Sequence, residues 1–415
     1  TAADKEALRT RLASLADRLD RYLAGEYGID AADEPKAFAR WRHSHKPFHW
    51  FSEFYGIMDA GGFDVVIGNP PYVEYSKVKG EYTVQGYAME ACGNLYAFFA
   101  ERNTCLFCAY GRTGMIVPHS AICTDRMAPV LRLLCRAAGA TWFSTYGIRP
   151  AKLFVGVDQR LLIYVTSRSS TSPGTWSSRY HRWHEESRPH LLPLVQYAST
   201  GTTGYVNSLP KVEAGTELML WERAGSRERL GSSFAMHNGA TVYFHNAPRY
   251  WVRAMDFAPY FWNERDGEQL STQVKTVLLP TKADAAVAVA ALNSSLFYWW
   301  FVILSDCRHL NMREIERFPI GLEKMSTAVK SDLAGLTREF MADLKRNKVR
   351  KECEYKTTGS VMYDEFYPGH SKPILDRIDC ALAKHYGFTD EQLDFIINYD
   401  IKYRMGQDAD DDDEA

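Results

Sequence analysis

The sequence predicts an α/β protein in which half of an open, mostly parallel sheet is followed by an α+β segment and a helical C-terminal region. Three observations lead to this class. Short β-branched runs alternate with helical stretches between residues 63 and 168. A stretch rich in Ser, Thr, Pro and Gly follows at residues 167–178, and charged helical sequence begins near Met325. At roughly 100–200 residues per domain, the 415 residues are enough for about two to four domains.

Residues 1–62 are expected to form an N-terminal helical segment. Leucines spaced by three or four residues predict an amphipathic helix over residues 5–24; they are Leu8, Leu12, Leu15, Leu19 and Leu23. An aromatic-rich stretch at residues 40–58 then leads through Gly61 and Gly62 into the apolar run 63–67. That short run, bounded by glycines, predicts a buried parallel strand.

Residues 63–168 carry the alternating pattern of strands and helices. Helices are expected over residues 94–109 and from Asp125 to Gly139, and strands over residues 114–117, 141–146 and 160–166. Cys105 and Cys108 form a lone C-x-x-C in the first of these helices. Buried thiols are favoured there over a metal site, because no second Cys or His pair has zinc-finger spacing. The eight cysteines, scattered without paired spacing, favour a cytoplasmic protein.

The rest of the sequence divides by composition into four segments. They are a linker at 169–190, an α+β segment at 191–320, a helical region at 321–405 and a disordered acidic tail at 406–415. Residues 285–304 carry no charge and have about the length of a membrane span. Asn293, Ser294 and Ser295 interrupt this run and basic flanks are missing, so we expect a buried helix and no membrane partner.

Charge becomes informative only when it is divided along the chain. The formal net charge is −2, and six acids among the last eight residues account for it, because without them the charge is +4. Residues 63–168 carry 11 basic and 7 acidic residues. A polyanionic partner is therefore allowed, but the net charge does not require one.

Asn69, Pro70, Pro71 and Tyr72, here called the tetrad, directly follow the expected strand and are the best candidates for chemistry. In open α/β sheets, ligands bind at the carboxyl ends of the strands. Two consecutive prolines remove two backbone N–H donors, which leaves nearby carbonyls free to accept. The Asn69 carboxamide adds an acceptor and Tyr72 adds a flat ring. These groups together suit a planar amine, whereas the plainer interpretation is a Pro-Pro turn that only ends a strand.

The sequence Gly68-Asn69-Pro70-Pro71-Tyr72 resembles the catalytic motif of amino-group methyltransferases. Residues 94–99 and 114–118 look like the next segments of DNA adenine-N6 methyltransferases. The fuller resemblance is to the large single-chain methylases of restriction-modification and phage-defence systems, through residues 48–75, 292–298 and 394–400. It implies a partial, Rossmann-like methyltransferase sheet at 63–168, dependent on S-adenosylmethionine, and a target recognition domain at 191–320.

This resemblance implies a site-specific DNA methyltransferase that acts on the N6 amino group of an adenine flipped out of double-stranded DNA. Asn69 and the Pro70 carbonyl would accept from the amine, and Tyr72 would stack on the base. Phe154 resembles the aromatic residue with which the family covers the flipped base. No metal is implied, because the sulfonium of the cofactor is already an activated leaving group.

The resemblance also implies contacts from Asn69, Leu95 and Phe98 to the cofactor S-adenosylmethionine, with Phe98 against its adenine. The family carries a glycine-rich turn upstream of the tetrad, and this sequence departs from that pattern, because no such turn precedes Asn69. We therefore expect an N-terminal half or a partner subunit to supply the cofactor-binding glycine turn.

Two alternatives to a DNA methyltransferase remain open. One is a non-catalytic DNA-recognition or assembly subunit whose partner holds the cofactor. The other is a methyltransferase for a protein glutamine or an RNA guanine, since these also use Asn-Pro-Pro-Tyr. For DNA contact, the densest run of positive charge, here called the basic strip, is Lys345, Arg346, Lys348, Arg350 and Lys351. A phosphate-contacting strip and a solvated helix end both account for it.

Overall fold

The computed structural model describes residues 1–136, 139–170, 172–200 and 207–405, so the acidic tail expected at 406–415 lies outside the described residues. The chain divides into two compact units. The first unit consists of Thr1–Ile148, Lys152–Ser177 and Ser199–Leu209, and the second of Arg149–Ala151, Ser178–Ala198 and Pro210–Ala415. The tetrad lies in the first unit.

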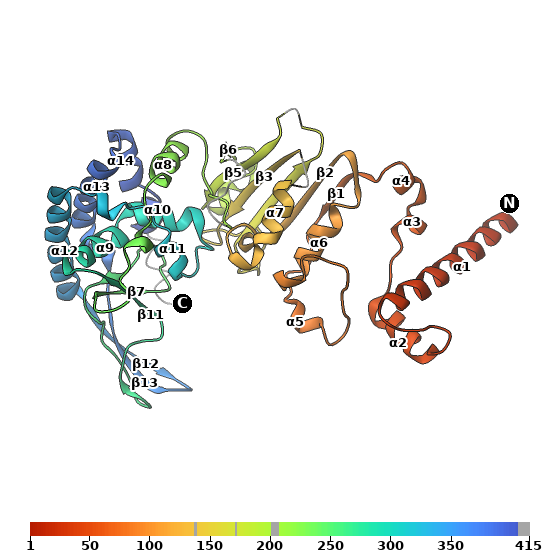
Figure 1. The fold of residues 1–415 in the computed structure, drawn as a ribbon, viewed down its shortest axis with the longest axis horizontal. Coiled ribbons are helices and arrows are strands. Elements are labelled where there is room, and N and C mark those ends of the chain that lie inside the picture. Colours follow the sequence, from red (N-terminus) through yellow and green to blue (C-terminus); the bar gives the residue numbers. More distant parts are fainter. Residues whose placement is uncertain (137–138, 171, 201–206, 406–415) are drawn as a thin grey trace. The chain divides into compact units, whose positions relative to one another are not determined.

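The first unit begins with helices and continues into a six-stranded sheet (Figure 1). Its helices are α1 (Ala2–Glu26), α2 (Pro35–His45), α3 (Trp50–Glu53), α4 (Tyr55–Asp59), α5 (Tyr75–Val78), α6 (Leu95–Asn103) and α7 (Ala128–Arg136). The strands of the sheet are β1 (Phe63–Gly68), β2 (Phe107–Pro118), β3 (Ala140–Tyr146), β4 (Leu161–Ser167), β5 (Gly174–His181) and β6 (Ala198–Ser199). Strands β1, β3 and β4 confirm the strands expected at 63–67, 141–146 and 160–166. The burial expected for the first of them is wrong, because every residue of β1 is exposed or only partly buried at the outer edge of the sheet.

The sheet is mixed, so the first unit has a mixed α/β fold. Its strand order is β1-β2-β4-β3-β5-β6. Strand β1 pairs in parallel with β2, but β4 runs antiparallel to both β2 and β3. The expectation of a mostly parallel sheet is therefore wrong for these pairs. The connection from β3 to β4 contains no helix, and such a connection joins antiparallel neighbours.

One face of the sheet carries the core of the first unit. Helices α6 and α7 lie over this face (Figure 1). Side chains alternate between the two faces along a strand, and the buried ones on this face are Met115, Val117, Phe143, Leu162 and Tyr164. The register aligns Met115 with Gly68 of β1 and with Tyr164 of β4, so the tetrad begins beside this core.

Two expectations about the stretch after α6 are wrong. The helix expected over residues 94–109 ends at Asn103, and β2 begins at Phe107. Cys105 is exposed and Cys108 is half-buried in β2, so the C-x-x-C does not lie in a buried helix. In an apolar run this short, the spacing of the apolar residues does not show where a helix ends and where the next strand begins.

The segment expected as a linker, residues 169–190, contains β5 and a 3-10 helix at Glu185–His190. Thr175, Ser177 and Ser178 are buried in β5. The hydroxyl-rich composition indicated a loop, whereas these small side chains lie within the sheet. Likewise, α7 begins at Ala128, after a 3-10 turn at Asp125–Met127, and not at Asp125.

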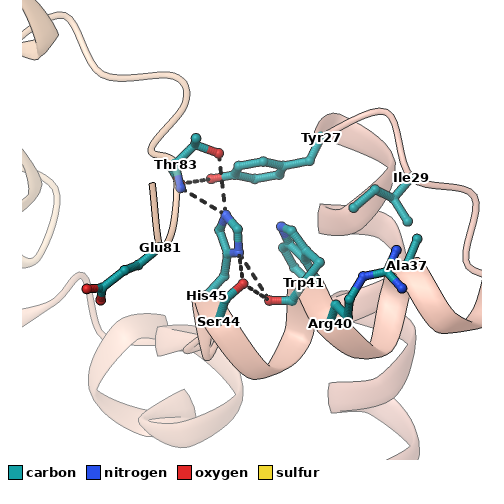
Figure 2. Close-up of a pocket in the computed structure, with 9 residues that line it drawn as sticks. All are labelled: Tyr27, Ile29, Ala37, Arg40, Trp41, Ser44, His45, Glu81 and Thr83. Carbon is teal, nitrogen blue, oxygen red and sulfur yellow. Dashed lines mark hydrogen bonds between the residues drawn. The ribbon is translucent and has the colours of Figure 1, made fainter. Parts of the chain in front are cut away.

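The N-terminal helices contact the segment that follows the tetrad, around a cavity of about 470 Å³ (Figure 2). The Tyr27 hydroxyl donates to the Thr83 carbonyl at 3.2 Å, and the Thr83 N–H donates to His45 Nε2 at 3.2 Å. His45 stacks on Trp41 with ring centroids 5.2 Å apart. The expected helix is confirmed by α1, but its apolar stripe is only partly covered, because Leu8, Leu12 and Leu15 are exposed.

The second unit combines helices with two small sheets (Figure 1). Its helices are α8 (Thr216–Gly225), α9 (Lys282–Asn293), α10 (Ser295–Leu304), α11 (Met312–Glu316), α12 (Thr327–Asn347), α13 (Lys372–Tyr386), α14 (Asp390–Ile397) and α15 (Ile401–Arg404). One sheet has the order β10-β9-β13-β12 and the other β11-β7-β8. Their strands are β7 (Ala240–His245), β8 (Ala254–Met255), β9 (Phe261–Asn263), β10 (Gly267–Glu268), β11 (Val274–Leu279), β12 (Val349–Tyr355) and β13 (Gly359–Glu365).

The uncharged run at 285–304 forms two helices, α9 and α10, bent by 65° relative to each other. The single helix expected there is wrong, because the Ser294 side chain caps a new helix by accepting from the Phe297 N–H at 3.0 Å. The expected burial is confirmed, since every residue of α10 is buried. Within the described ranges, no single helix is long and apolar enough to cross a membrane, and α9 with α10 passes that test by length and composition only.

A buried polar network joins the C-terminal helices to the start of α10. Asp379 of α13 accepts from the backbone N–H groups of Ser295 and Leu296 at 3.1 and 3.2 Å. Arg404 donates to the Ser295 hydroxyl and to the Tyr250 carbonyl. Burial alone raises the pKa of Asp379, to about 6, although the two N–H donors and Arg404 oppose that rise.

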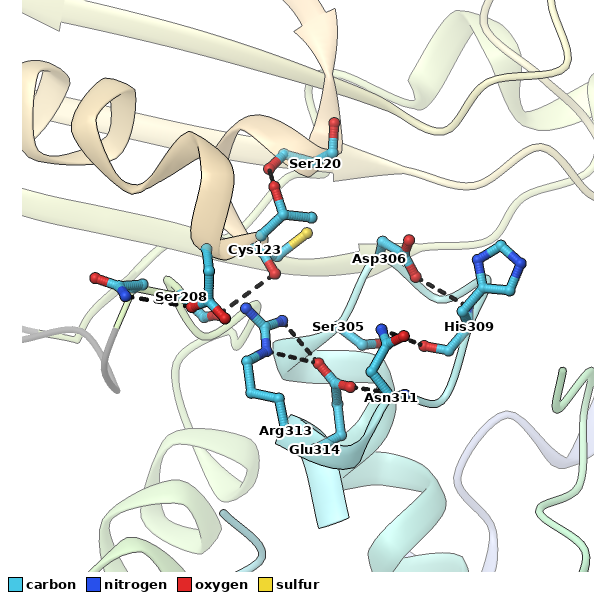
Figure 3. A network of polar contacts seen from close by, with 12 residues as sticks. Ser120, Cys123, Ser208, Ser305, Asp306, His309, Asn311, Arg313 and Glu314 are labelled. Atoms are coloured by element: carbon cyan, nitrogen blue, oxygen red, sulfur yellow. Dashed lines mark hydrogen bonds and ion pairs between the residues drawn. The ribbon is translucent and has the colours of Figure 1, made fainter. Parts of the chain in front are cut away.

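Two smaller polar contacts fix local structure in the two units (Figure 3). In the second unit, Glu314 accepts from the Asn311 N–H at 3.0 Å and pairs with Arg313 at 2.7 Å, which caps α11. In the first unit, the Ser208 hydroxyl donates to the Cys123 carbonyl at 3.5 Å.

Candidate active site

The tetrad leaves the carboxyl end of β1, as expected for a ligand site in an α/β sheet. Asn69 and Pro71 are exposed, Pro70 is buried and Tyr72 is partly buried against the core. β1 is the outermost strand of the sheet order. The tetrad therefore stands at the edge of the sheet, with the Asn69 side chain accessible from solvent.

Tyr72 and Asn69 are in direct contact. The Tyr72 hydroxyl lies 2.6 Å from Asn69 Oδ1 and 3.0 Å from the Ile116 carbonyl, and both oxygens accept from it. Burial raises the pKa of Tyr72 to about 12, so the hydroxyl keeps its proton and remains a donor at neutral pH. The Asn69 carboxamide oxygen is therefore an acceptor in this structure, and Tyr72 occupies it.

The backbone after the tetrad is tied to the start of α6. The Leu95 N–H donates to the Val73 carbonyl at 2.9 Å, and the Tyr75 N–H donates to the Gly93 carbonyl at 2.9 Å. Leu95 is thus close in the structure to the residue that follows the tetrad. This link fixes where the chain goes after Tyr72, and so helps to hold the tetrad in place.

An ion pair that the sequence analysis missed lies beside this link. Glu74 accepts from Arg126 at 2.6 Å and from Asn94 at 3.3 Å. The Arg126 hydrogen bond lowers the pKa of Glu74. Glu74 follows the tetrad by two residues and could have been noticed, whereas Arg126 is 52 residues away and no local pattern points to it.

Leu95 and Phe98 are buried, with 8% and 6% of their surfaces exposed. Phe98 lies edge-on between Tyr75 and Tyr87, with ring centroids 5.2 and 5.4 Å apart. In this structure both residues belong to α6 and point into the core. Their contact with a cofactor stays a prediction.

Phe154 lies on the connection between β3 and β4, where the Val157 N–H donates to the Phe154 carbonyl at 3.3 Å. The pairings show that β1, β2 and β3 all run in the same direction. The connection that leaves β3 therefore starts from the same end of the sheet as the tetrad. This placement brings Phe154 and Tyr72 to the same end of the sheet, with β2 and β4 between their strands, and the stacking role of Phe154 stays a prediction.

The basic strip lies in the second unit, across the end of α12 and the start of β12, and so is not a single helix end. Its cations already have partners. Lys348 and Arg350 both pair with Asp364, and Lys351 pairs with Glu365 at 3.6 Å. Arg346 pairs with Asp343 at 3.3 Å, and Lys345 lies over the ring of Phe257 at 4.2 Å. These side chains remain partly exposed, and their contact with DNA stays a prediction.

No group of three or more metal-ligating side chains occurs among the residues that the structure describes.

Comparison with curated proteins finds no match. Three solved restriction-modification enzymes are similar over part of the chain. The type IIL enzyme MmeI in complex with DNA is 10% identical, with a TM-score of 0.43, over 82% of this chain and 57% of its own. The type IIG endonuclease BpuSI is 12% identical, with a TM-score of 0.29, over 85% and 55%. The type ISP enzyme LlaGI, with a DNA substrate mimic, is 10% identical, with a TM-score of 0.31, over 47% and 18%. The chain thus spans less than two thirds of each.

A family model matches part of the first unit. The match runs over residues 15–132, from α1 through the tetrad and α6 into α7, and ends before Phe154. It contains the sheet edge on which Asn69 and Tyr72 meet. Over these residues, the chain is similar to the Eco57I restriction-modification methylase family.

Proposed function

We propose that the chain is the catalytic and recognition part of a site-specific DNA methyltransferase, in a restriction-modification or phage-defence system. Its substrate is the N6 amino group of an adenine flipped out of double-stranded DNA, and its methyl donor is S-adenosylmethionine. One observation carries the proposal: Asn69 Oδ1 stands at the carboxyl end of β1 and accepts a hydrogen bond from a neutral donor. The match of residues 15–132 to a methylase family supports it.

The tetrad can hold an amine in place. An aromatic amine has two N–H bonds, and Asn69 Oδ1 and the Pro70 carbonyl are acceptors that suit them. In the structure the Tyr72 hydroxyl occupies Asn69 Oδ1. The hydroxyl therefore competes with the amine for this oxygen, although an amide oxygen can accept two hydrogen bonds. We infer that the hydroxyl moves away when the base binds, which would free the ring of Tyr72 to stack on it.

The described residues do not by themselves fit S-adenosylmethionine. Cofactor sites of this fold class use a glycine turn that lets the backbone approach the ligand. Gly62 serves another purpose, because a Cβ at this position would lie 2.5 Å from the Leu106 carbonyl oxygen. It allows β1 to enter the sheet close to β2. Leu95 and Phe98 are buried, so among the described residues the acceptor side of the reaction is exposed at the tetrad and the proposed contacts to the donor are not.

The proposal assigns cofactor binding, base recognition and phosphate contact to different segments. An N-terminal half or partner subunit supplies the cofactor turn. Residues 191–320 read base edges, and the basic strip contacts phosphates after exchanging its carboxylate partners for DNA. The proposed location is the cytoplasm, where DNA is the substrate.

Transfer of a tritiated methyl group tests the proposal. The full protein is incubated with labelled S-adenosylmethionine and, separately, with duplex DNA, transfer RNA and ribosomes. Label in N6-methyladenine of the duplex is the expected result, and Asn398→Ala serves as a control because the Asn398 side chain donates to Asp394, one turn earlier in α14. Label in RNA or protein alone would replace the proposed substrate. No label with any of them would favour the non-catalytic DNA-recognition subunit.

A further inference from the structure

The first half of α1 is an exposed stretch of helix with an apolar side. Every residue from 1 to 15 is exposed. Leu8 is 58% exposed, Leu12 is 41% exposed and Leu15 is 40% exposed, and these three residues with Leu19 are here called the leucine stripe. Most of the stability of a protein helix comes from packing of its apolar side. Exposed leucines gathered on one side are therefore typical of an interaction surface.

The leucine stripe does not face the helix that holds α1 in place. Near its C-terminal end, Ala24 of α1 packs in a cluster with Phe38 and Trp41 of α2. Asp20 of α1 is buried and pairs with Arg42 of α2 at 2.7 Å. At about 100° per residue, Asp20 and Ala24 lie roughly a third of a turn away from the stripe. The side of α1 that α2 covers is therefore not the leucine side.

The spacing of the leucine stripe is that of a coiled coil. Its successive leucines are four, three and four residues apart. This spacing places Leu8 and Leu15 at position d of a heptad, and Leu12 and Leu19 at position a. In a coiled coil, the side chains at a and d insert between those of a facing helix. The occupant that suits the stripe is therefore a helix with the same repeat.

The residues beside the leucine stripe are basic. Positions e and g, which set the choice of partner in a coiled coil, are occupied here by Arg9, Arg11, Ala16 and Arg18. Arg9 pairs with the exposed Glu6 at 3.5 Å. Arg11 and Arg18 form no ion pair with any residue that the structure describes. The charge that complements this surface is a row of carboxylates.

We propose that the leucine stripe docks an amphipathic helix of a partner protein, with apolar residues at heptad spacing and Glu or Asp on both flanks. This interaction surface goes beyond the proposed function and does not depend on it. The apolar residues of the partner helix cover the leucines, and its carboxylates pair with Arg9, Arg11 and Arg18.

Neither a second copy of α1 nor the acidic run at 408–414 meets both requirements. Antiparallel copies would place the arginines at position g opposite one another. Parallel copies would leave Arg11 and Arg18 opposite Ala16 and Leu23, which carry no charge. The run at 408–414 has the required charge but contains no large apolar residue that could insert.

Two designed peptides test the charge and the repeat of the occupant. Both are helices of about three heptads with Leu at a and d, and they differ only in carrying Glu or Lys at e and g. Fluorescence anisotropy measures the binding of each labelled peptide to the full chain. The Glu peptide should bind at least about tenfold tighter than the Lys peptide, because it forms ion pairs with the arginines beside the stripe. Equal affinities, or no binding of the Glu peptide, would overturn the proposal.

The variant Leu12→Asp/Leu15→Asp shows whether the leucine stripe is the binding surface. It should weaken binding of the Glu peptide at least about tenfold, because carboxylates replace two of the leucines that the peptide covers. Leu194→Asp is the matched control and should bind as before, since Leu194 is 72% exposed and lies in the second unit. Circular dichroism reports whether each chain is folded. Undiminished binding in the double variant would place the peptide on another surface and contradict the proposal.

The variant Arg11→Glu/Arg18→Glu keeps the leucines and reverses the charge beside them. It should reverse the preference, so that the Lys peptide binds tighter than the Glu peptide. A preference for the Glu peptide that persists would exclude pairing with these arginines. Sedimentation velocity of the full chain tests the second copy as the occupant. A dimer that Leu12→Asp/Leu15→Asp abolishes would assign the stripe to self-association and reject the partner helix.

Discussion

The tetrad and the buried polar network around the start of α10 differ in the surroundings of their acceptor side chains, Asn69 and Asp379. Asn69 is exposed at a sheet edge, and its oxygen accepts from one hydroxyl that can move away. Asp379 is buried, and its two oxygens accept from fixed backbone groups of another helix. An acceptor with a replaceable partner can bind a substrate, whereas one with fixed partners holds a fold together. Substitutions should therefore separate activity from stability between the two units.

Asp379→Ala should produce the largest effect, and it should be on stability. It leaves two buried N–H groups of α10 without acceptors and removes a charge near Arg404, so we expect a loss of about 3–5 kcal/mol in the free energy of unfolding. Urea unfolding followed by tryptophan fluorescence reports on it, because Trp299 and Trp300 lie in α10. Asp376→Ala, on the same helix, should cost less than about 1 kcal/mol. Equal losses in both variants would contradict the role of the network.

Glu217→Gln sharpens the comparison through pH. Glu217 is buried and accepts from the Trp299 indole at 3.0 Å and the Glu213 N–H at 2.9 Å. Burial raises its pKa from 4.5 to about 7, so the folded state holds the proton more tightly than the unfolded state. The contribution of Glu217 to the free energy of unfolding is fully present below pH 4.5. It is lost as pH rises through 7, which lowers the free energy of unfolding by about 3 kcal/mol.

Measurement of unfolding free energy between pH 4.5 and 8 checks this effect. Glu217→Gln should flatten the dependence over that window, at a pH-independent cost of about 1 kcal/mol for the imperfect amide hydrogen bonds. Methyl transfer by the folded fraction should keep its own pH profile. A pH dependence that survives the substitution would assign it to other groups.

Asn69→Ala should lower activity and leave stability nearly unchanged, which is the opposite of the effect expected for Asp379→Ala. In the complete enzyme we expect turnover to fall by about a hundredfold or more, near 2.7 kcal/mol of transition-state stabilisation, because the amine loses an acceptor. Stability and DNA affinity should change little, since Asn69 is exposed. Rapid-quench measurement of methylated DNA gives the rate. Equal turnover in the variant would remove Asn69 from the catalytic group.

Tyr72→Phe tests whether the partner of Asn69 is replaceable. It removes the hydroxyl that occupies Asn69 Oδ1 but keeps the ring, so kcat/KM for DNA should rise by up to about fivefold, the value of one hydrogen bond near 1 kcal/mol. Tyr110→Phe, at an exposed position of β2, should have no effect. A large loss of activity in Tyr72→Phe would mean that the hydroxyl itself takes part in the reaction.

The smallest effect is expected at the basic strip. Replacing Lys345, Arg346 and Lys348 by Gln should weaken all duplexes alike and lower the salt slope by about 0.9 for each lost phosphate contact. The effect is limited because Arg346 and Lys348 are already paired with Asp343 and Asp364, which offset part of their positive charge. Fluorescence anisotropy at several salt concentrations measures both quantities. An unchanged slope would remove the strip from the DNA interface.

A helix or strand was predictable from the sequence where its residues follow one strong local pattern. The runs at 141–146 and 160–166 are apolar, β-branched and bounded by turn residues, and they became β3 and β4. The direction of β4 was not predictable, because a buried strand has the same composition in either direction. β5 was missed because hydroxyl side chains such as Thr175 are typical of a loop by composition, whereas here they are buried in the sheet.

The candidate site also has one part that the sequence predicts and another part that it does not. The position of the tetrad after β1 followed from adjacent residues, because a strand and the turn that ends it are contiguous. The contacts of Tyr72 with Ile116, and of Glu74 with Arg126, span 44 and 52 residues. Such contacts depend on how β2 and α7 pack, so no local spacing reveals them. The open edge of β1 likewise follows from strand order, which composition does not encode.

The bend between α9 and α10 has a consequence for synthesis of the chain. Helices α9 and α10, which contain the uncharged run 285–304, leave the ribosome well before α13, which is complete at residue 386. At about 5–20 residues per second, those 82 residues take about 4–16 s. During that time the apolar surface of α10 is not yet covered by α13, the helix that carries Asp379. The second unit should therefore depend on chaperones that bind nascent chains, and slower translation after residue 304 should lower its yield.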